Sequence, residues 1–485
     1  MQNEKVSIKK NYIYNTFYRL LTVITPFITA PYVSRVLGAD RIGIQSFTES
    51  IVTYFALFAA LGTASYGQRE IAMARDSLEK RSRLFWEIEI LSILTTLAVT
   101  AVWVVWIFVA SRYNAFYLVL TITLVSVAFD ISWYYSGLEL FRYIVIRNSV
   151  VKILGIILLF VFVHKPDDVL LYVGIGATTG LLGNISMWSY LPKLIKKVPY
   201  KTLRPFSHFK NTLAYFIPTI AISVYTVLDK TMIGIIVKGE SKEQNGFYEQ
   251  ATKIVRMTQT VLLSLNTVMA SRMSYLFAQK KEDEIRKKID QSFDCLMCLA
   301  IAIMFGLIGI AKWFVPWFYG EDYAPVIPMI MLMSPIPFVV CISNILGNQY
   351  LTPSGQRVRS SKGIILGAVV NFLCNLILIR FFQAAGAILA SVLAETIISI
   401  SYVHMSKGFV SWLQIWGKCY KRLIAGGIMC FVVFLIGYGR QPGIVLTLIQ
   451  VCAGALIYAG LLWVMKDSIL SLIGELNIFK GRRKK

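Results

Sequence analysis

Long apolar segments, separated by short polar connections, follow one another along the whole chain. A bilayer core requires about 20 mostly apolar residues per helix, and by that measure the sequence predicts about fourteen spans. Glycine, proline and charged residues mark most connections, as in SRVLGAD, HKPDD and GRQPG. The spans start near Tyr12, Gly43, Trp86, Phe116, Ile144, Val169, Asn211, Gly246, Ser292, Pro325, Gly363, Ala384, Arg422 and Gly443. We therefore expect an all-α polytopic membrane protein.

A weak internal repeat divides these spans into two halves. Residues 41–52 (RIGIQSFTESIV) resemble residues 244–255 (QNGFYEQATKIV), and the region 134–154 runs parallel in pattern to 350–370. We expect two pseudo-symmetric lobes of six helices each, followed by two extra helices. An even number of spans per repeat gives both lobes one orientation, with a cavity between them. The expected domains are residues 1–200, residues 201–408, and residues 409–485 with spans 13 and 14 and a basic tail.

Composition and charge agree with this reading. Apolar residues make up 56% of the chain and charged residues 15%, whereas charged residues are near a quarter of a soluble globular protein. The 49 basic and 26 acidic residues give a net charge of +23. Because the basic residues collect in alternate short loops, membrane topology explains them better than a nucleic-acid partner. Both termini are expected in the cytoplasm.

Two expected spans, beginning near Asn211 and Gly246, carry charge where membrane helices rarely do. A charged side chain at the bilayer centre costs roughly 3 kcal/mol on insertion scales, so such residues usually face a bundle interior or a wet cavity. With span 1, they suggest a common chamber that carries positive charge. The candidate substrate-binding residues are Asn15, Arg19, Tyr215, Lys230, Lys253, Arg256, Asn344 and Asn371.

Acidic residues in the spans are candidates for ion coupling, namely Glu49, Asp130, Asp229 and Glu395. Structural alternatives stay open for several of these positions. Lys230 and Lys253 can reach water at the interface. Arg19 with Glu49, and Lys230 with Asp229, can form static ion pairs. The asparagines can join helices by hydrogen bonds, and Glu395 can be a neutral structural acid.

Motifs of catalysis or metal binding do not occur in the sequence. There is no GxxxxGK[ST] loop and no G-x-S-x-G nucleophile elbow. His164, His208 and His404 stand singly, without carboxylate or cysteine partners at metal-ligand spacing, and the CxxC pair Cys295 and Cys298 lies in a hydrophobic run. The pattern favours transport over catalysis, with no cofactor and no metal.

The opening of the chain resembles bacterial polysaccharide flippases of the multidrug, oligosaccharidyl-lipid and polysaccharide exporter superfamily. The similarity is carried by two prolines in span 1, the motif SRVLG, the glycine that opens span 2, and GQREIA. The stretches YTVLDKTMIGIIV and GFYEQATKIV look like the start of the second lobe in the same family. The resemblance covers essentially the whole chain and identifies the family better than the individual glycan.

The resemblance implies a flippase of the bacterial plasma (inner) membrane. Such a protein moves undecaprenyl-diphosphate-linked oligosaccharide repeat units from the inner to the outer leaflet, by alternating access through a cationic central cavity. The implied role is the biosynthesis of a surface polysaccharide such as O-antigen, capsule or exopolysaccharide. The implied partners are the lipid-linked oligosaccharide and membrane lipids, with a polysaccharide polymerase and a chain-length regulator as further candidates.

Three other functions stay open from the sequence. A peptidoglycan-precursor flippase would have the same chamber charge. A multidrug or cation antiporter of the same superfamily is expected to keep unpaired acids in its chamber, whereas this sequence offers at least as many bases. A membrane glycan polymerase should carry a sizeable external loop with catalytic residues, but the outward loops here are short.

The chamber hypothesis makes a direct prediction. Replacing Arg256 or Arg19 by Ala should abolish surface glycan without losing the protein from the membrane, because the diphosphate would lose a cationic contact. Surface glycan and membrane-fraction immunoblots measure the two effects. Normal glycan in both variants would remove the hypothesis.

Overall fold

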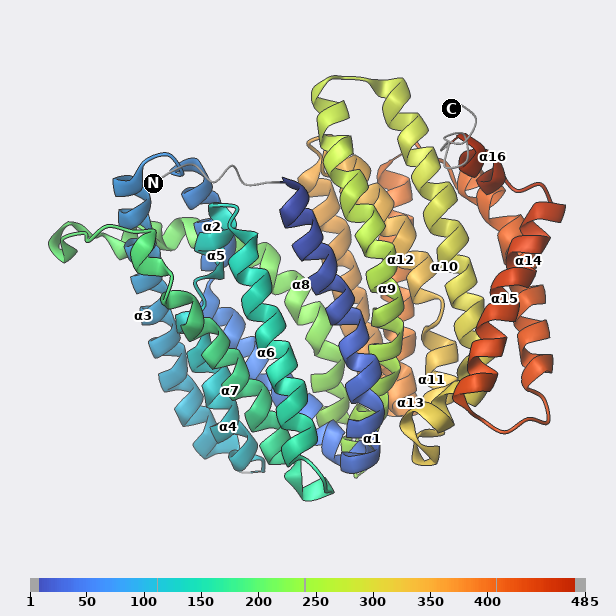
Figure 1. Ribbon diagram of the computed structural model, residues 1–485, viewed down its shortest axis with the longest axis horizontal. Coiled ribbons are helices and arrows are strands. Elements are labelled where there is room, and N and C mark those ends of the chain that lie inside the picture. The colour runs from blue at the N-terminus through green and yellow to red at the C-terminus, as the bar shows by residue number, and fades with distance from the viewer. Residues whose placement is uncertain (1–7, 111, 240, 407, 476–485) are drawn as a thin grey trace. The chain divides into compact units, whose positions relative to one another are not determined.

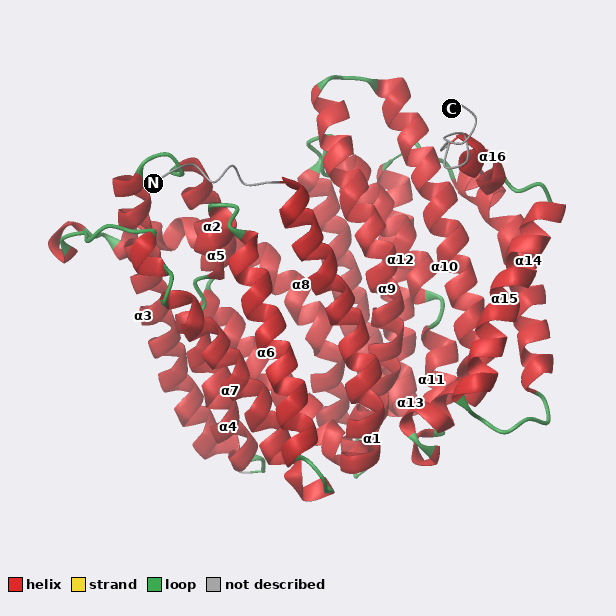
Figure 2. Cartoon of the chain, viewed as in Figure 1, coloured by secondary structure: helices red, strands yellow, loops and turns green. Residues whose placement is uncertain are grey.

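The computed structural model describes residues 8–475 except 111, 240 and 407. Some helical residues in that range have described backbones but no described side chains. These are 8–20, 23, 110, 217–219, 221, 222, 224–226, 264, 265, 267, 268, 270, 271 and 473–475. In the described part of the chain, the elements are helices joined by loops, with no strand (Figure 2). This confirms the all-α class.

The chain divides into two compact units, each described by itself. Unit 1 runs through Gly234 and also includes Ser241–Gly246. Unit 2 consists of Ile235–Glu240 and the chain from Phe247. The expected boundaries near residues 200 and 408 remain predictions.

Among the described residues, unit 1 contains seven whole helices and most of an eighth. The helices are α1 (Ile8–Ala60), α2 (Thr63–Met73), α3 (Leu78–Ala110), α4 (Asn114–Ser126), α5 (Ser132–Gly137), α6 (Phe141–Phe162), α7 (Val169–Trp188) and most of α8 (Phe209–Ile236). Short 3₁₀ segments lie between them: η1 (Val127–Phe129), η2 (Pro166–Asp168), η3 (Leu191–Lys193), η4 (Tyr200–Thr202) and η5 (Pro205–His208).

Unit 2 contains most of α9 and all helices that follow it. In this unit α10 contacts both α14 and α15, and in unit 1 α4 contacts both α3 and α7 (Figure 1). The elements are α9 (Ser241–Ala278), α10 (Glu282–Tyr319), η6 (Glu321–Tyr323), α11 (Val326–Met333), α12 (Ile336–Asn344), the π-helical η7 (Ile345–Leu351), α13 (Arg357–Met405), α14 (Trp412–Gly437), α15 (Ile444–Val464) and α16 (Ser468–Glu475).

Ten helical stretches among the described residues are long and apolar enough to cross a membrane, which makes this a multi-pass membrane protein. Two of the stretches are folded back on themselves, at Gly38 in α1 (φ 75°) and at Gln383 in α13 (φ 51°). A straight helix of 53 residues would be about 80 Å long, well beyond a bilayer, so a break is required. Helices α8 and α9 are also long, α9 is the more polar of the two, and several of their side chains lie outside those described. The expected count of about fourteen spans stays a prediction.

The two glycines that align in the internal repeat lie against each other's helices in unit 1. A Cβ on Gly43 would overlap the carbonyl group of Lys242, and a Cβ on Gly246 would overlap the carbonyl oxygen of Ala39. The backbone of α1 and the first turn of α9 therefore approach more closely than any other residue would allow. Small residues serve this purpose at helix crossings in membranes.

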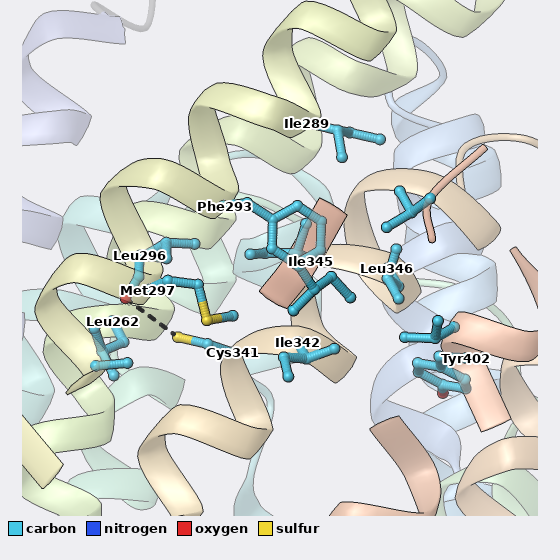
Figure 3. Close-up of a cluster of buried hydrophobic side chains, with 14 of the residues drawn as sticks. Leu262, Ile289, Phe293, Leu296, Met297, Cys341, Ile342, Ile345, Leu346 and Tyr402 are labelled. Atoms are coloured by element: carbon cyan, nitrogen blue, oxygen red, sulfur yellow. Dashed lines mark hydrogen bonds between the residues drawn. The ribbon is translucent and has the colours of Figure 1, made fainter. Parts of the chain in front are cut away.

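The core of unit 2 lies where α10, α12, η7 and α13 meet (Figure 3). Leu296 and Met297 of α10 are buried against Cys341 of α12, whose thiol lies 3.9 Å from the carbonyl oxygen of Leu296. The ring of Tyr402 fills the space beside Gly347 and Gly363, where a Cβ would collide with it. The kinked α13 and the π-helical η7 are thus held by one aromatic side chain.

A buried ionic network attaches α14 and the start of α16 to α10. The guanidinium of Arg422 is fully buried and donates to Asp294 Oδ1 at 2.8 Å and to Asp467 Oδ1 at 2.7 Å. Lys418 Nζ donates to Asp294 Oδ2 at 2.6 Å. Removing one partner from such a buried ion pair typically lowers the free energy of unfolding by roughly 3–5 kcal/mol, because an uncompensated charge stays buried. The network therefore holds the C-terminal helices on unit 2.

The glycine contact predicts a stability effect. Gly43→Ala should lower the free energy of unfolding by about 1–3 kcal/mol, because the added methyl group forces α1 and α9 apart. Thermal unfolding of the full chain in detergent measures it. Gly427→Ala is the matched control, since nothing lies within 4 Å of a Cβ at that helical position. Equal melting temperatures for the two variants would contradict the account.

Candidate functional site

A pocket of about 530 Å³ lies in unit 1, among α1, α4, α6 and α7. Its lining is mixed: eight of the seventeen residues carry a hydroxyl, amide or charged group, and the other nine are apolar or glycine. The residues that line it are Thr25, Thr29, Gln45, Glu49, Val52, Thr53, Leu120, Thr123, Lys152, Gly155, Ile156, Leu159, Tyr172, Val173, Ile175, Gly176 and Ala177. In a bundle of membrane-spanning helices, such a lining is unusual because lipid offers polar groups no hydrogen bonds.

The fold of α1 at Gly38 places both of its arms on the pocket. The second arm contributes Gln45, Glu49 and Thr53, which are spaced four residues apart and so share one helix face. The amide of Gln45 donates to Glu49 Oε1 at 3.1 Å, and the hydroxyl of Thr53 donates to the Glu49 carbonyl at 2.7 Å. The bond from Gln45 holds the Glu49 carboxyl at the pocket wall.

The first arm of α1 contributes two hydroxyl groups. Thr25 donates to the carbonyl of Leu21 at 2.7 Å, and Thr29 donates to the carbonyl of Thr25 at 3.1 Å. Because each hydroxyl donates its hydrogen bond to a backbone carbonyl of its own helix, its oxygen lone pairs can accept a hydrogen bond from a ligand. A ligand rich in hydroxyl donors suits this wall.

Lys152 brings a cation to the same pocket from α6. It is half-buried, and its neighbours Val150 and Ile153 are exposed on the apolar outside of the helix. The sequence reasoning missed this lysine, although a single lysine inside the apolar stretch 141–162 was the available signal. Lys152 and Glu49 give the pocket one charge of each sign.

Contacts at the fold of α1 fix this helix against α6 and η2. The hydroxyl of Tyr32 donates to the carbonyl of Val163 at 2.6 Å, and its ring lies 4.6 Å from that of Phe160. Arg41 forms an ion pair with Asp167 at 3.0 Å. The helices that carry Thr25 and Lys152 are thereby tied together at one end.

Unit 1 also holds four other residues predicted from the sequence. Asp130 accepts from the backbone N–H of Ser132, the first residue of α5, at 3.0 Å. The hydroxyl of Tyr215 accepts from Arg69 at 3.1 Å. On α8, Asp229 is buried and Lys230 half-buried. Among the candidates whose side chains the structure describes in this unit, Glu49 lines the pocket.

The other predicted residues lie elsewhere in the chain. Asn344 accepts from Asn348 at 2.8 Å, and buried Asn371 accepts from Asn375 at 3.1 Å, so both take part in hydrogen bonds between side chains. In unit 2, Glu395 and Lys253 are half-buried and Arg256 is exposed. The side chains of Asn15 and Arg19 lie outside those described. A chamber shared by these residues stays a prediction.

His208 has a carboxylate partner that the sequence did not reveal. Its Nε2 lies 2.9 Å from Glu87 Oε2 on α3, and its Nδ1 lies 2.7 Å from the hydroxyl of Tyr66 on α2. The partners are 121 and 142 residues away in the chain. No group of three or more His, Cys, Asp or Glu that could hold a metal occurs in the described residues. The contact therefore ties η5 to α2 and α3.

Comparisons with known proteins give consistent results. A family model described as "Polysaccharide biosynthesis protein" matches residues 8–277. The "Putative O-antigen transporter" of Escherichia coli (strain K12) is 23% identical over 404 residues, 82% of this chain and 96% of that protein. The "Probable low-salt glycan biosynthesis flippase Agl15" of Haloferax volcanii is 22% identical over 247 residues, 50% of this chain and 51% of that protein.

Solved structures share the architecture. The structure "Lipid II flippase MurJ, inward closed conformation" aligns with a TM-score of 0.74 at 16% identity, over 94% of this chain and 98% of that one. An inward-facing multidrug resistance MATE family transporter of the MOP superfamily aligns with a TM-score of 0.62 at 12% identity, over 86% and 95%. The chain has the helical fold of these transporters.

The polar lining predicts that water enters the pocket. In a variant without the seven native cysteines, Thr123→Cys should react with a small hydrophilic thiol reagent, because a thiol must ionise in water to react. Leu118→Cys is the matched control, since position 118 is 61% exposed on the apolar outside of α4. Equal, slow labelling of both cysteines would show that the pocket is dry.

Proposed function

The chain belongs to the polysaccharide biosynthesis protein family, and we propose that it is a flippase for lipid-linked oligosaccharide repeat units. In this proposal the substrate is an undecaprenyl-diphosphate oligosaccharide, carried from the inner to the outer leaflet of the bacterial plasma membrane. The proposal also places both termini in the cytoplasm, as the distribution of basic residues among the loops predicts. The names of the relatives, an O-antigen transporter and a glycan biosynthesis flippase, support transport rather than catalysis.

The observation that carries this proposal is the polar pocket inside unit 1. A hydroxyl moved into hydrocarbon without a compensating hydrogen bond costs roughly 2–7 kcal/mol, so an oligosaccharide crosses a bilayer very slowly unaided. A wall of threonine hydroxyls, Gln45, Glu49 and Lys152 supplies donors and acceptors that replace water. A pocket of about 530 Å³ has room for a small group of sugars.

The diphosphate needs cations, which the predicted chamber residues would supply. Arg19, Lys230, Lys253 and Arg256 are the candidates, and arginine suits bidentate contact with phosphate. The polyprenyl tail stays in the bilayer in this proposal, with α14 and α15 as guides. Outward movement of negative charge gains about 2.3 kcal/mol per charge per 100 mV, so the membrane potential would assist transport.

A peptidoglycan precursor is the second candidate substrate. The structural likeness to a lipid II flippase favours it, and both substrates are saccharides on a lipid diphosphate. For a polysaccharide repeat unit, a polymerase and a chain-length regulator would act on the product. Cells that lack their own O-antigen transporter or their own lipid II flippase distinguish the two, because the chain should rescue only the cells whose substrate it carries.

The pocket predicts a transport defect in a lysine variant. Lys152→Met should lower surface glycan about tenfold or more, because a charge-assisted hydrogen bond contributes roughly 1.5–3 kcal/mol. Lys152→Arg should retain transport because it keeps the charge. Surface glycan is measured in cells lacking their own transporter, at equal protein in the membrane.

The control for this experiment is Val150→Met on the apolar outside of the same helix, where position 150 is 57% exposed. It should leave surface glycan unchanged. Normal glycan in Lys152→Met would show that this pocket does not handle the substrate.

A further inference from the structure

One face of α3 carries buried oxygen atoms that make no hydrogen bonds. Glu89, Thr96 and Thr100 are seven and four residues apart, a spacing that places them on the same helix face. Glu89 is 1% exposed and Thr96 is 2% exposed. Within the described part of the chain, neither carboxyl oxygen of Glu89 nor either threonine hydroxyl has a hydrogen-bond partner. Most buried polar groups in proteins are paired, so this line calls for an explanation.

The neighbouring acid on the same helix shows the usual arrangement. Glu87 is 5% exposed, yet its carboxyl accepts from Arg83 Nε at 2.9 Å and from the backbone N–H of Arg204 at 3.0 Å. It also bonds to His208 at 2.9 Å. The fold therefore supplies cationic and N–H partners to an acid two residues from Glu89. The lack of partners at Glu89 is a local property of its own helix face.

The surroundings of Glu89 disfavour a negative charge. The carboxyl of Asp130 lies within electrostatic range, and the indole of Trp133 lies beside Glu89. On the other elements near this part of α3, His208 of η5 faces Glu87, and Tyr66 of α2 is bonded to His208. A buried carboxylate with no cation and a second acid nearby costs several kcal/mol, whereas the neutral acid costs far less.

We propose that Glu89 is a proton-binding site, neutral in this conformation, and that buried water along Thr96 and Thr100 connects it to bulk solvent. Water molecules inside proteins typically bond to buried polar groups that lack other partners. The line from Glu89 to Thr100 is roughly 16 Å long at 1.5 Å per residue, about half the thickness of a bilayer core. Release of the proton leaves the Glu89 carboxylate and transfers H⁺ to the adjoining water.

The position of the site gives proton binding a structural consequence. Asp130 lies at the break between η1 and α5, where its side chain accepts from the backbone N–H of Ser132, the first residue of α5. A change of one charge at Glu89 therefore acts on a helix interruption rather than on a continuous helix. Proton binding at Glu89 would let the protein respond to a pH gradient. This inference does not depend on which lipid-linked substrate the protein carries.

Infrared spectroscopy of the full chain in lipid nanodiscs tests the site. The wild type should show the carbonyl stretch of a neutral carboxylic acid at neutral pH, sensitive to exchange from H₂O into D₂O. Glu89→Gln should remove this band. Glu87→Gln is the matched control and should keep it, because Glu87 is paired with Arg83 and His208 and is expected to be ionised.

A double threonine variant tests the water path, and a second variant at position 89 keeps the proton site testable if the first does not fold. Thr96→Val with Thr100→Val should slow the isotope exchange of the band by about tenfold, since two hydrogen-bonding groups are lost. Should Glu89→Gln fail to fold, Glu89→Asp keeps the acid and should shift the band. A wild type without the band, or a band unchanged in the position 89 variants, overturns the proton site. Unchanged exchange in the double variant overturns the water path.

Discussion

The structure depends on one constraint: inside hydrocarbon, a polar group must find its partner within the protein. Arg422 shows the constraint satisfied, since its buried guanidinium is shared between Asp294 and Asp467 and joins α14 and α16 to α10. The contact between Glu87 and His208 likewise pairs two buried polar groups and joins α3 to η5. At Gly43 and Gly246 the absence of side chains allows two helix backbones to meet directly. Pairing and close approach together hold helices that lipid alone would not bring together.

The same constraint separates structural polar groups from functional ones. Where partners are supplied in full, as around Arg422, a charge serves the fold. The pocket beside Lys152 and Glu49 instead collects hydroxyl and amide groups around open space, which stabilises no core. Glu89 lies in a third situation, buried and without a partner among the described side chains. The proposed transport of sugars draws on the second situation, and the proposed proton binding at Glu89 on the third.

The sequence predicts the helical class, the multi-pass character and the family, because all three follow from local apolar runs and short motifs. The internal repeat also pointed to Gly43 and Gly246, although their contact could not be foreseen. His208 stood alone in the sequence because its partner Glu87 is 121 residues away. Lys152 and Glu89 were missed because helical periodicity shows which residues share a face, but not which neighbouring helix that face meets. The predicted chamber rests on side chains such as Arg19 that the structure does not describe.

The most direct test of the account is flipping by the purified full chain in vesicles that contain an undecaprenyl-diphosphate oligosaccharide. Glycan that starts in the inner leaflet should become accessible to an external lectin at a rate well above that of protein-free vesicles. The rate should rise when the interior is made negative, because negative charge then moves outward with the field. A folded protein that leaves the glycan as protected as it is in empty vesicles would contradict the proposed transport.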